Sequence, residues 1–199
     1  MLSTAYFPPI EYFSAIAHAR TAWVEGEEAY LKQSYRTRCH IYAAGGRETL
    51  QVPVCHGPSK LIRDIRIDYT HPWLHQHTIA IKSAYGASPF FMYYWDDIER
   101  LLHQGHKYLF DLNMDLTRHL ISVLGISTPV ESTSEFCAEW RGEDLRGAMH
   151  PKRKCPSLYE RHVSDKPYYQ VFSDRAGFIP NLSILDLVFH EGPESADYL

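Results

Sequence analysis

The sequence lacks the features that mark several large classes of protein. No apolar run approaches the roughly 18 residues of a membrane span, so we expect no transmembrane helix. The first residues have no charged segment followed by an apolar one, which argues against a signal peptide. The four cysteines are scattered without a C-x-x-C pair, which is typical of reduced thiols. We therefore predict a cytoplasmic protein.

An excess of positive charge is also absent. Lysine and arginine number 20 against 24 aspartates and glutamates, which gives a formal net charge of -4. A protein dedicated to duplex nucleic acid is usually basic, so we predict no such partner. The glycine-rich phosphate-binding motifs and the G-x-S-x-G nucleophile motif are missing as well. The cofactor and the oligomeric state stay unknown at this stage.

The order of elements at the start of the chain favours an α/β fold. We expect a strand at 2–7, a helix opened by Pro8 and Pro9, and a second strand at 21–25. Such βαβ units favour a parallel sheet, and ligands of open α/β sheets bind at the carboxyl ends of the strands. This places the loop at 6–12 and the acidic turn at 25–28 on the candidate functional edge.

The remaining pattern completes a single α/β domain over residues 1–199, with a mixed, largely parallel central sheet and flanking helices. A β-hairpin is expected at about 39–54, because A-G-G-R separates two strand-like runs. Further expected elements are a strand at 61–68, a helix at 73–85, a helix opened by Ser88 and Pro89, a helix capped by Asn113, and a last helix capped by Asn181. Periodicity fails at about 128–167, and such long irregular segments are usually mobile or functional.

The segment Y-L-K-Q-S-Y-R-T-R at 30–38 is the strongest candidate for an anion site. Arg36 and Arg38 are two residues apart and would share one face of an extended strand, with Lys32 and Tyr35 beside them. Two guanidiniums on one face suit phosphate or carboxylate oxygens. The alternative is an edge strand whose charges only prevent aggregation.

Candidate catalytic groups come from two other places in the chain. His75 or His77 could act as a general base, or be satisfied in a polar patch. His71 and His75 could share a helix face and bind a metal, but no acidic third ligand is near, so we predict no metal site. Tyr12 or Glu11 sits beside the first helix, where nucleotide-handling α/β enzymes present a polar residue; this is an analogy of layout.

The C-terminal block adds a possible third group of ligands. If Asn181 caps the last helix, Ser183 falls in its first turn, where unpaired backbone N–H groups attract anions. We expect this block to pack against the N-terminal one and to complete the site. The alternative is an ordinary capped helix that fills the core.

The blocks described above resemble the WbqC-like protein family. The resembling segments are A-Y-F-P-P-I-E-Y-F at 5–13, Y-L-K-Q-S-Y-R-T-R-C at 30–39, L-Q-V-P-V at 50–54, I-R-D-I-R-I at 62–67, the run at 83–94, D-L-N at 111–113 and the run at 170–194. The chain departs from the family pattern at Ala5 and Glu11, where many members have Gln and Gly. It also departs at Tyr35, Thr37 and Cys39, where many read W-x-N-R-N.

The resemblance implies a function in the synthesis of O-antigen or other surface glycans. The leading hypothesis is an enzyme that transfers an acyl or aminoacyl group, with glycine as one candidate, to a small-molecule or glycan-linked substrate. The competing hypothesis is a non-catalytic module that binds an anionic sugar, a nucleotide-sugar or a protein partner. An enzyme needs a titratable base at the anion site, whereas a binding module does not.

Overall fold

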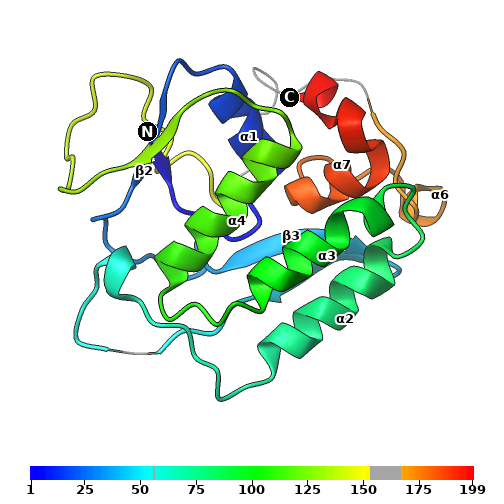
Figure 1. The fold of residues 1–199 in the computed structure, drawn as a ribbon, viewed down its shortest axis with the longest axis horizontal. Helices are drawn as coiled ribbons and strands as arrows, with labels where there is room; N and C mark the ends of the chain where they lie inside the picture. Colours follow the sequence, from blue (N-terminus) through cyan, green and yellow to red (C-terminus); the bar gives the residue numbers. More distant parts are fainter. Residues whose placement is uncertain (56, 153–166) are drawn as a thin grey trace.

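The computed structural model describes residues 1–55, 57–152 and 167–199 (Figure 1). Residues 153–166, which include Cys155 and belong to the segment predicted to be irregular, lie outside the described residues. The elements are β1 (Leu2–Ser3), α1 (Ile10–Ala17), β2 (Ala22–Glu25), β3 (Arg38–Ala43), β4 (Gly46–Gln51), η1 (Ile62–Asp64), α2 (Trp73–Tyr85), α3 (Phe91–Leu102), α4 (Leu109–Val123), β5 (Val130–Ser132), α6 (Ser173–Ala176), α7 (Ile184–Glu191) and η2 (Gly192–Tyr198).

The strands form two separate sheets. A three-stranded sheet has the order β1-β2-β5 and is parallel throughout, with Leu2 opposite Val24 and Ala22 opposite Val130. The hairpin of β3 and β4 is antiparallel and turns at Gly46, whose φ of 102° suits glycine. The α/β class, the parallel pairing of the first strand and the hairpin are therefore confirmed, and the hairpin forms a sheet of its own.

Helix α7 lies at the centre of the hydrophobic core. Its residues from Ile184 to His190 are all buried, and it contacts α1, α3 and β3. Figure 1 shows α1 and α7 side by side, although their sequences lie at opposite ends of the chain. The apolar stripe of α1, which includes Phe13 and Ile16, faces this core. The mostly apolar sequence of α7, interrupted by Asp186, thus reflects burial on every side.

Backbone hydrogen bonds join the C-terminal block directly to the N-terminal one. The Ile10 N–H donates to the Leu182 carbonyl at 3.1 Å, and the Ile184 N–H donates to the Pro8 carbonyl at 2.9 Å. Pro9 and Ser183 form an isolated antiparallel bridge between these two bonds. The predicted packing of the two ends is therefore confirmed.

Three local predictions were wrong. The expected strand at 61–68 is a 3-10 turn followed by isolated bridges, in which Ile67 pairs with Val54 and Arg66 with Tyr108. Asn113 does not cap a helix but lies inside α4, fully buried, where its Nδ2 donates to the Arg36 carbonyl at 2.9 Å. Helix α3 begins at Phe91, after Ser88 and Pro89.

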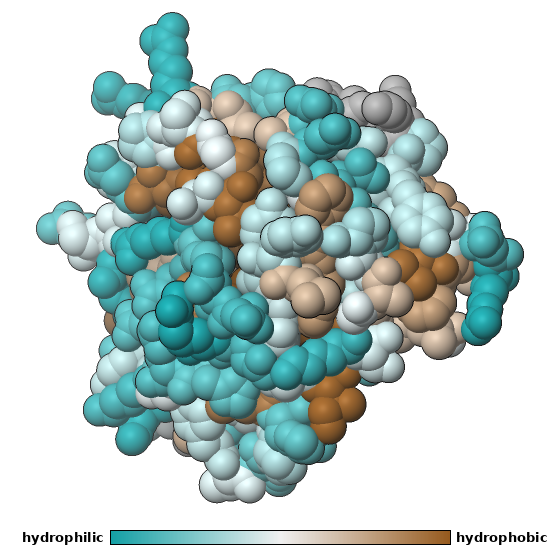
Figure 2. Space-filling model, turned by 45° about the vertical axis from the view of Figure 1, so that its right-hand side comes forward, coloured by the Kyte–Doolittle hydropathy of each residue, from teal (hydrophilic) through white to brown (hydrophobic). Residues whose placement is uncertain are grey.

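The distribution of apolar side chains on the surface and the length of the helices bear on what the protein can bind. On the face drawn in Figure 2, apolar residues form separate small groups among hydrophilic ones, so that face offers no broad apolar docking surface. Across the described parts of the chain, none of the helices combines the length and the apolar character that crossing a bilayer requires.

Candidate functional site at the carboxyl edge of the parallel sheet

The three parallel strands end at a cluster of buried polar side chains. Glu25, the last residue of β2, is fully buried and accepts a hydrogen bond from the Thr133 hydroxyl at 2.5 Å. Its other oxygen accepts from the Cys137 N–H and from Arg146 Nη1, both at 3.1 Å. Burial by itself would raise the pKa of Glu25, but these donors hold it below its ordinary value. Glu25 is therefore a fixed negative charge that anchors Arg146.

A buried ion pair lies next to this anchor. The Arg36 guanidinium donates to Glu28 twice, from Nε to Oε1 at 2.9 Å and from Nη2 to Oε2 at 2.5 Å. Nη2 also donates to the Ser3 hydroxyl at 2.9 Å, at the end of β1. Burial raises the pKa of Glu28, although Arg36 opposes this shift. The charge of Arg36 is thus already compensated by a protein carboxylate.

Three of the predicted site residues meet in one small cavity, which we call the edge hollow. Its volume is about 10 Å³, and Tyr12, Tyr35 and Arg36 contribute to its wall. The full lining is Ser3, Thr4, Ala5, Tyr12, Tyr35, Arg36, Leu145, Arg146 and Met149. A cavity of this size has room for about one water molecule.

The hydroxyl groups of the edge hollow act as donors. Burial raises the pKa of both Tyr12 and Tyr35, so both phenols keep their protons at neutral pH. Tyr12 donates its proton to the Ser3 carbonyl at 3.1 Å. The Thr4 hydroxyl is buried and has no hydrogen-bond partner among the described residues. A buried hydroxyl without a hydrogen-bond partner costs free energy. The Thr4 hydroxyl is therefore a candidate for a hydrogen bond to a ligand.

The remaining cations of the basic segment do not join the edge hollow. Strand β3 begins at Arg38, and Arg36 lies in the preceding turn, so the premise that the two share one strand face was wrong. Arg38 donates to the Gln51 side chain at 3.1 Å across the hairpin. Lys32 is exposed in the same turn as Arg36 and does not line the hollow.

The two candidate histidines lie on different sides of α2 and away from the edge hollow. His77 is buried, and its Nδ1 lies 2.9 Å from the hydroxyl of Tyr6. Burial lowers the pKa of His77 to about 4, so the ring is neutral at physiological pH. His75 is exposed. Within the described residues, no three His, Cys, Asp or Glu side chains gather as a metal site would require.

Asn181 and Ser183 both cap helices, but not in the predicted way. The Asn181 Oδ1 accepts from the Glu11 N–H at 3.0 Å, so Asn181 caps α1, the helix at the other end of the chain. Ser183 is the N-cap of α7, where its hydroxyl accepts from the Leu185 N–H at 3.4 Å. The prediction that Asn181 caps the last helix was wrong. Neither residue lines the edge hollow.

A Ser-His-Asp set also occurs, but its geometry is structural. Ser88 Oγ lies 3.2 Å from His190 Nε2, while His190 Nδ1 lies 2.6 Å from the backbone carbonyl of Asp186. All three side chains are buried, and Asp186 accepts hydrogen bonds from Tyr168 and Gln170. The set fixes α7 to its surroundings and offers no surface to a substrate.

Sequence reasoning missed Thr4, Thr133 and Arg146. Thr4 stands next to A-Y-F-P-P, and its position at the end of the first strand was the signal that could have found it. Thr133 and Arg146 fall in the stretch where periodicity fails, so no pattern of spacing could place them. Glu25 and Glu28, in contrast, belong to the acidic turn that the strand order had placed on this edge.

Comparison with known proteins agrees with the resemblance of the sequence blocks. The WbqC-like protein family matches residues 4–154, which include most of the edge hollow and both of its acidic anchors. A relative is "Uncharacterized protein Rv1507c" of Mycobacterium tuberculosis, 28% identical over 224 residues that cover 100% of this chain and 96% of the relative. No solved structure matches. The chain belongs to the WbqC-like protein family.

Proposed function

We propose that this protein transfers an acyl or aminoacyl group, with glycine as one candidate, to a sugar in the synthesis of O-antigen or another surface glycan. The resemblance to WbqC-like proteins supports the setting of the reaction. The substrate would be a small molecule or a nucleotide-linked or lipid-linked sugar, and no duplex nucleic acid takes part. The cytoplasmic location belongs to this proposal as well.

The edge hollow is the observation that carries the proposal. It lies at the carboxyl edge of a parallel sheet, where open α/β folds bind their ligands. The unpaired Thr4 hydroxyl and the protonated Tyr35 phenol can both donate to the oxygen that becomes negative during acyl transfer. Arg36 lines the same cavity and is held in place by its ion pair with Glu28.

In this proposal the base is Glu11, which does not line the edge hollow itself but precedes Tyr12, which does. Glu11 is buried in the first turn of α1, and its charge raises the pKa of Tyr35, which lines the hollow. Burial raises the pKa of Glu11 itself. A carboxylate whose pKa is shifted toward neutrality is better suited to take a proton from an incoming hydroxyl or amine. The pair of Glu11 and Tyr35 therefore favours an enzyme over a passive binding module.

The second candidate function is a non-catalytic module that binds an anionic sugar, a nucleotide-sugar or a protein partner. The pairing of Arg36 with Glu28 weakens the attraction for an anion, so the observation in favour of this module is the composition of the hollow's lining. No histidine lines the hollow in the described part of the chain. These features suit binding as well as catalysis.

A ligand screen by thermal shift tests the proposal. Nucleotide-sugars, amino acids and acyl donors are added singly and in pairs, and a ligand at 100 times its Kd should stabilise the protein by about 2.7 kcal/mol. Thr4→Val and Tyr35→Phe should reduce the shift, whereas Tyr169→Phe, at an exposed tyrosine, should not. A shift that both hollow variants leave unchanged would place the site elsewhere and contradict the proposal.

The variant Glu11→Gln separates the two candidate functions. For an enzyme, it should keep the ligand-induced shift and lose most transfer of a labelled acyl group to the sugar. The expected loss is about 100-fold to 10,000-fold, the usual contribution of a general base. Undiminished transfer would remove Glu11 from the mechanism, and binding without any transfer by the wild type would support the binding module.

A further inference from the structure

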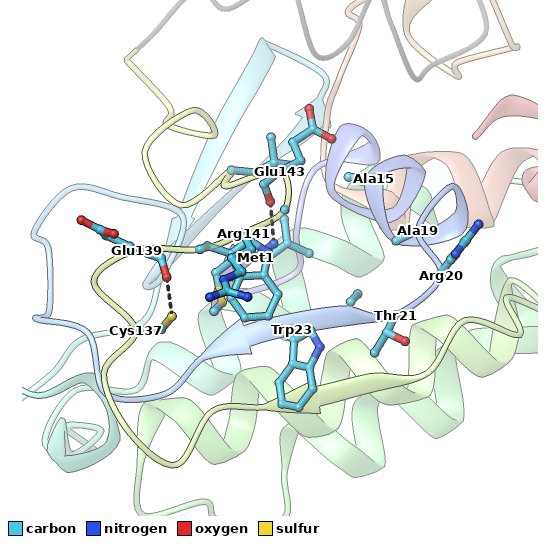
Figure 3. Close-up of a pocket in the computed structure, with 15 residues that line it drawn as sticks. Met1, Ala15, Ala19, Arg20, Thr21, Trp23, Cys137, Glu139, Arg141 and Glu143 are labelled. Carbon is cyan, nitrogen blue, oxygen red and sulfur yellow. Dashed lines mark hydrogen bonds between the residues drawn. The ribbon is translucent and has the colours of Figure 1, made fainter.

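A second and larger cavity, which we call the tryptophan pocket, shares Leu145 with the edge hollow. Its volume is about 710 Å³. Figure 3 shows it enclosed by the first residues of the chain, the end of α1, the start of β2 and the loop at 137–145. This volume lies within the usual range for small-molecule sites, roughly 300–1,000 Å³. Nothing in the proposed transfer step requires this pocket.

The walls of the tryptophan pocket are mainly apolar. Trp23 of β2 and Trp140 of the loop contact each other at a tilt, with ring centroids 6.1 Å apart and an angle of 55° between the rings. Ala15 of α1 and Ala19, just after that helix, supply another wall, and their small side chains leave space beside them. Two indoles and an aliphatic wall favour a flat or elongated apolar group.

The rim of the same pocket carries charged side chains of both signs, two arginines and two glutamates. Arg20 and Arg141 are exposed, and neither forms an ion pair with a carboxylate among the described residues. In Figure 3 the Arg141 side chain lies at the middle of the group, whereas the carboxylates of Glu139 and Glu143 point outward in different directions. An arginine without a protein partner at the mouth of an apolar pocket suits a phosphate or a carboxylate.

We propose that the tryptophan pocket binds an anionic amphiphile, a molecule with an apolar body and a phosphate or carboxylate end. The body packs against the two indoles and against Ala15 and Ala19, and the anionic end contacts Arg141, with Arg20 beside it. The inference does not depend on the proposed transfer, because it concerns binding alone. Where both hold, the apolar part of an acyl donor lies in this pocket and its acyl end approaches Leu145.

Decyl phosphate, kept below its micelle concentration, is the probe for this proposal. Binding is followed by calorimetry and by tryptophan fluorescence, since the two indoles line the pocket. Decyltrimethylammonium has the same chain with the opposite charge, and inorganic phosphate has the charge without the chain. We expect decyl phosphate to bind at least tenfold more tightly than either, because only this molecule has both an alkyl chain to contact the apolar wall and a phosphate to contact the arginines of the rim.

Two variants assign that binding to the pocket. Arg141→Gln should weaken decyl phosphate about tenfold by removing a charge-assisted contact. Ala15→Leu should weaken it further by filling the space beside α1. Arg175→Gln, at an exposed arginine of α6, is the matched control and should change nothing. Circular dichroism and the thermal midpoint establish that each variant is folded.

Three results would overturn the proposal. Equal binding of the cationic and anionic detergents would remove the role of the arginines. Binding of inorganic phosphate as tight as that of decyl phosphate would remove the role of the apolar wall. Wild-type affinity in both Arg141→Gln and Ala15→Leu would place the ligand outside the pocket. Thr4→Val distinguishes the two cavities, because it should leave decyl phosphate binding unchanged while it reduces the ligand shift of the transfer site.

Discussion

Replacing Arg36 with methionine should destabilise the protein strongly, because it leaves Glu28 as a buried carboxylate without its partner. Both side chains are less than a tenth exposed, and the pair is joined by hydrogen bonds of 2.9 and 2.5 Å. Removing one partner of such a pair costs about 3–5 kcal/mol. Because domains of this size are stable by only about 5–15 kcal/mol, the loss is a large fraction of the total.

The loss of stability in Arg36→Met should depend on pH, and the direction of that dependence follows from the shifted pKa of Glu28. Burial raises this pKa above 4.5 in the folded protein even with Arg36 present. For an acid whose folded pKa is raised, stability falls as pH rises from the unfolded pKa through the folded one. Without Arg36 the folded pKa of Glu28 is higher still, so this window extends upward. Arg36→Met should therefore be closer to wild type at pH 5 than at pH 8.

Urea unfolding at the two pH values measures both effects, and Arg38→Met is the matched control. Arg38 is half-buried and forms a hydrogen bond to the Gln51 side chain, with no carboxylate partner among the described residues, so its loss should cost about 1 kcal/mol. The double variant Glu28→Leu with Arg36→Met should recover much of the stability, since it leaves no buried charge. An Arg36→Met protein within 1 kcal/mol of wild type at pH 8 would refute the reasoning, and so would a loss that is the same at both pH values.

Three further predictions concern other contacts. Asn181→Gly should cost about 1 kcal/mol of stability, because the Glu11 N–H loses its cap. Asn181→Ala should cost more, because the φ of 54° is strained for alanine. Urea unfolding of both variants separates the loss of the cap from the backbone strain. His77 should stay neutral at pH 5, which an NMR titration checks. Because its pKa is lowered to about 4, this residue should reduce the free energy of unfolding by about 3 kcal/mol as the pH falls from 6.5 to about 4, which acid unfolding measures. Cys39, whose pKa burial raises, should resist iodoacetamide while half-exposed Cys137 reacts, as peptide mapping would show.

The local sequence pattern was sufficient to predict an element where the residues of that element determine its structure. The helix at 73–85 was predicted to the residue, because its apolar positions repeat with helical spacing and one face packs on the hairpin. The parallel opening followed from the order of strand, proline turn, helix and strand. In each case the sequence signal lies within the element or between neighbouring elements along the chain.

Prediction failed where a side chain serves a distant part of the chain. Asn181 has the right residue type and position to cap the helix that follows it, but its oxygen binds the Glu11 N–H, 170 residues away. Asn113 likewise matches a local cap and instead holds the backbone at Arg36. The candidate site is the hardest to predict, because Arg36 contacts Ser3, 33 residues away, through the fold. Nothing in the spacing of the two arginines reveals that one of them is already paired.

The segment from Leu145 to Met149 controls how a ligand could reach the edge hollow. Leu145, Arg146 and Met149 form part of its wall, and a volume of about 10 Å³ admits no acyl group or sugar while they stay in place. The Leu145 N–H is bonded to the Met1 carbonyl, and Arg146 is held by Glu25, so displacement must break both contacts. If the displaced state is a fraction f of the population, the measured Kd rises by 1/f. Arg146→Met would weaken the anchor, raise f and tighten binding in the edge hollow if Arg146 only closes the site, whereas weaker binding would show that its guanidinium also contacts the ligand.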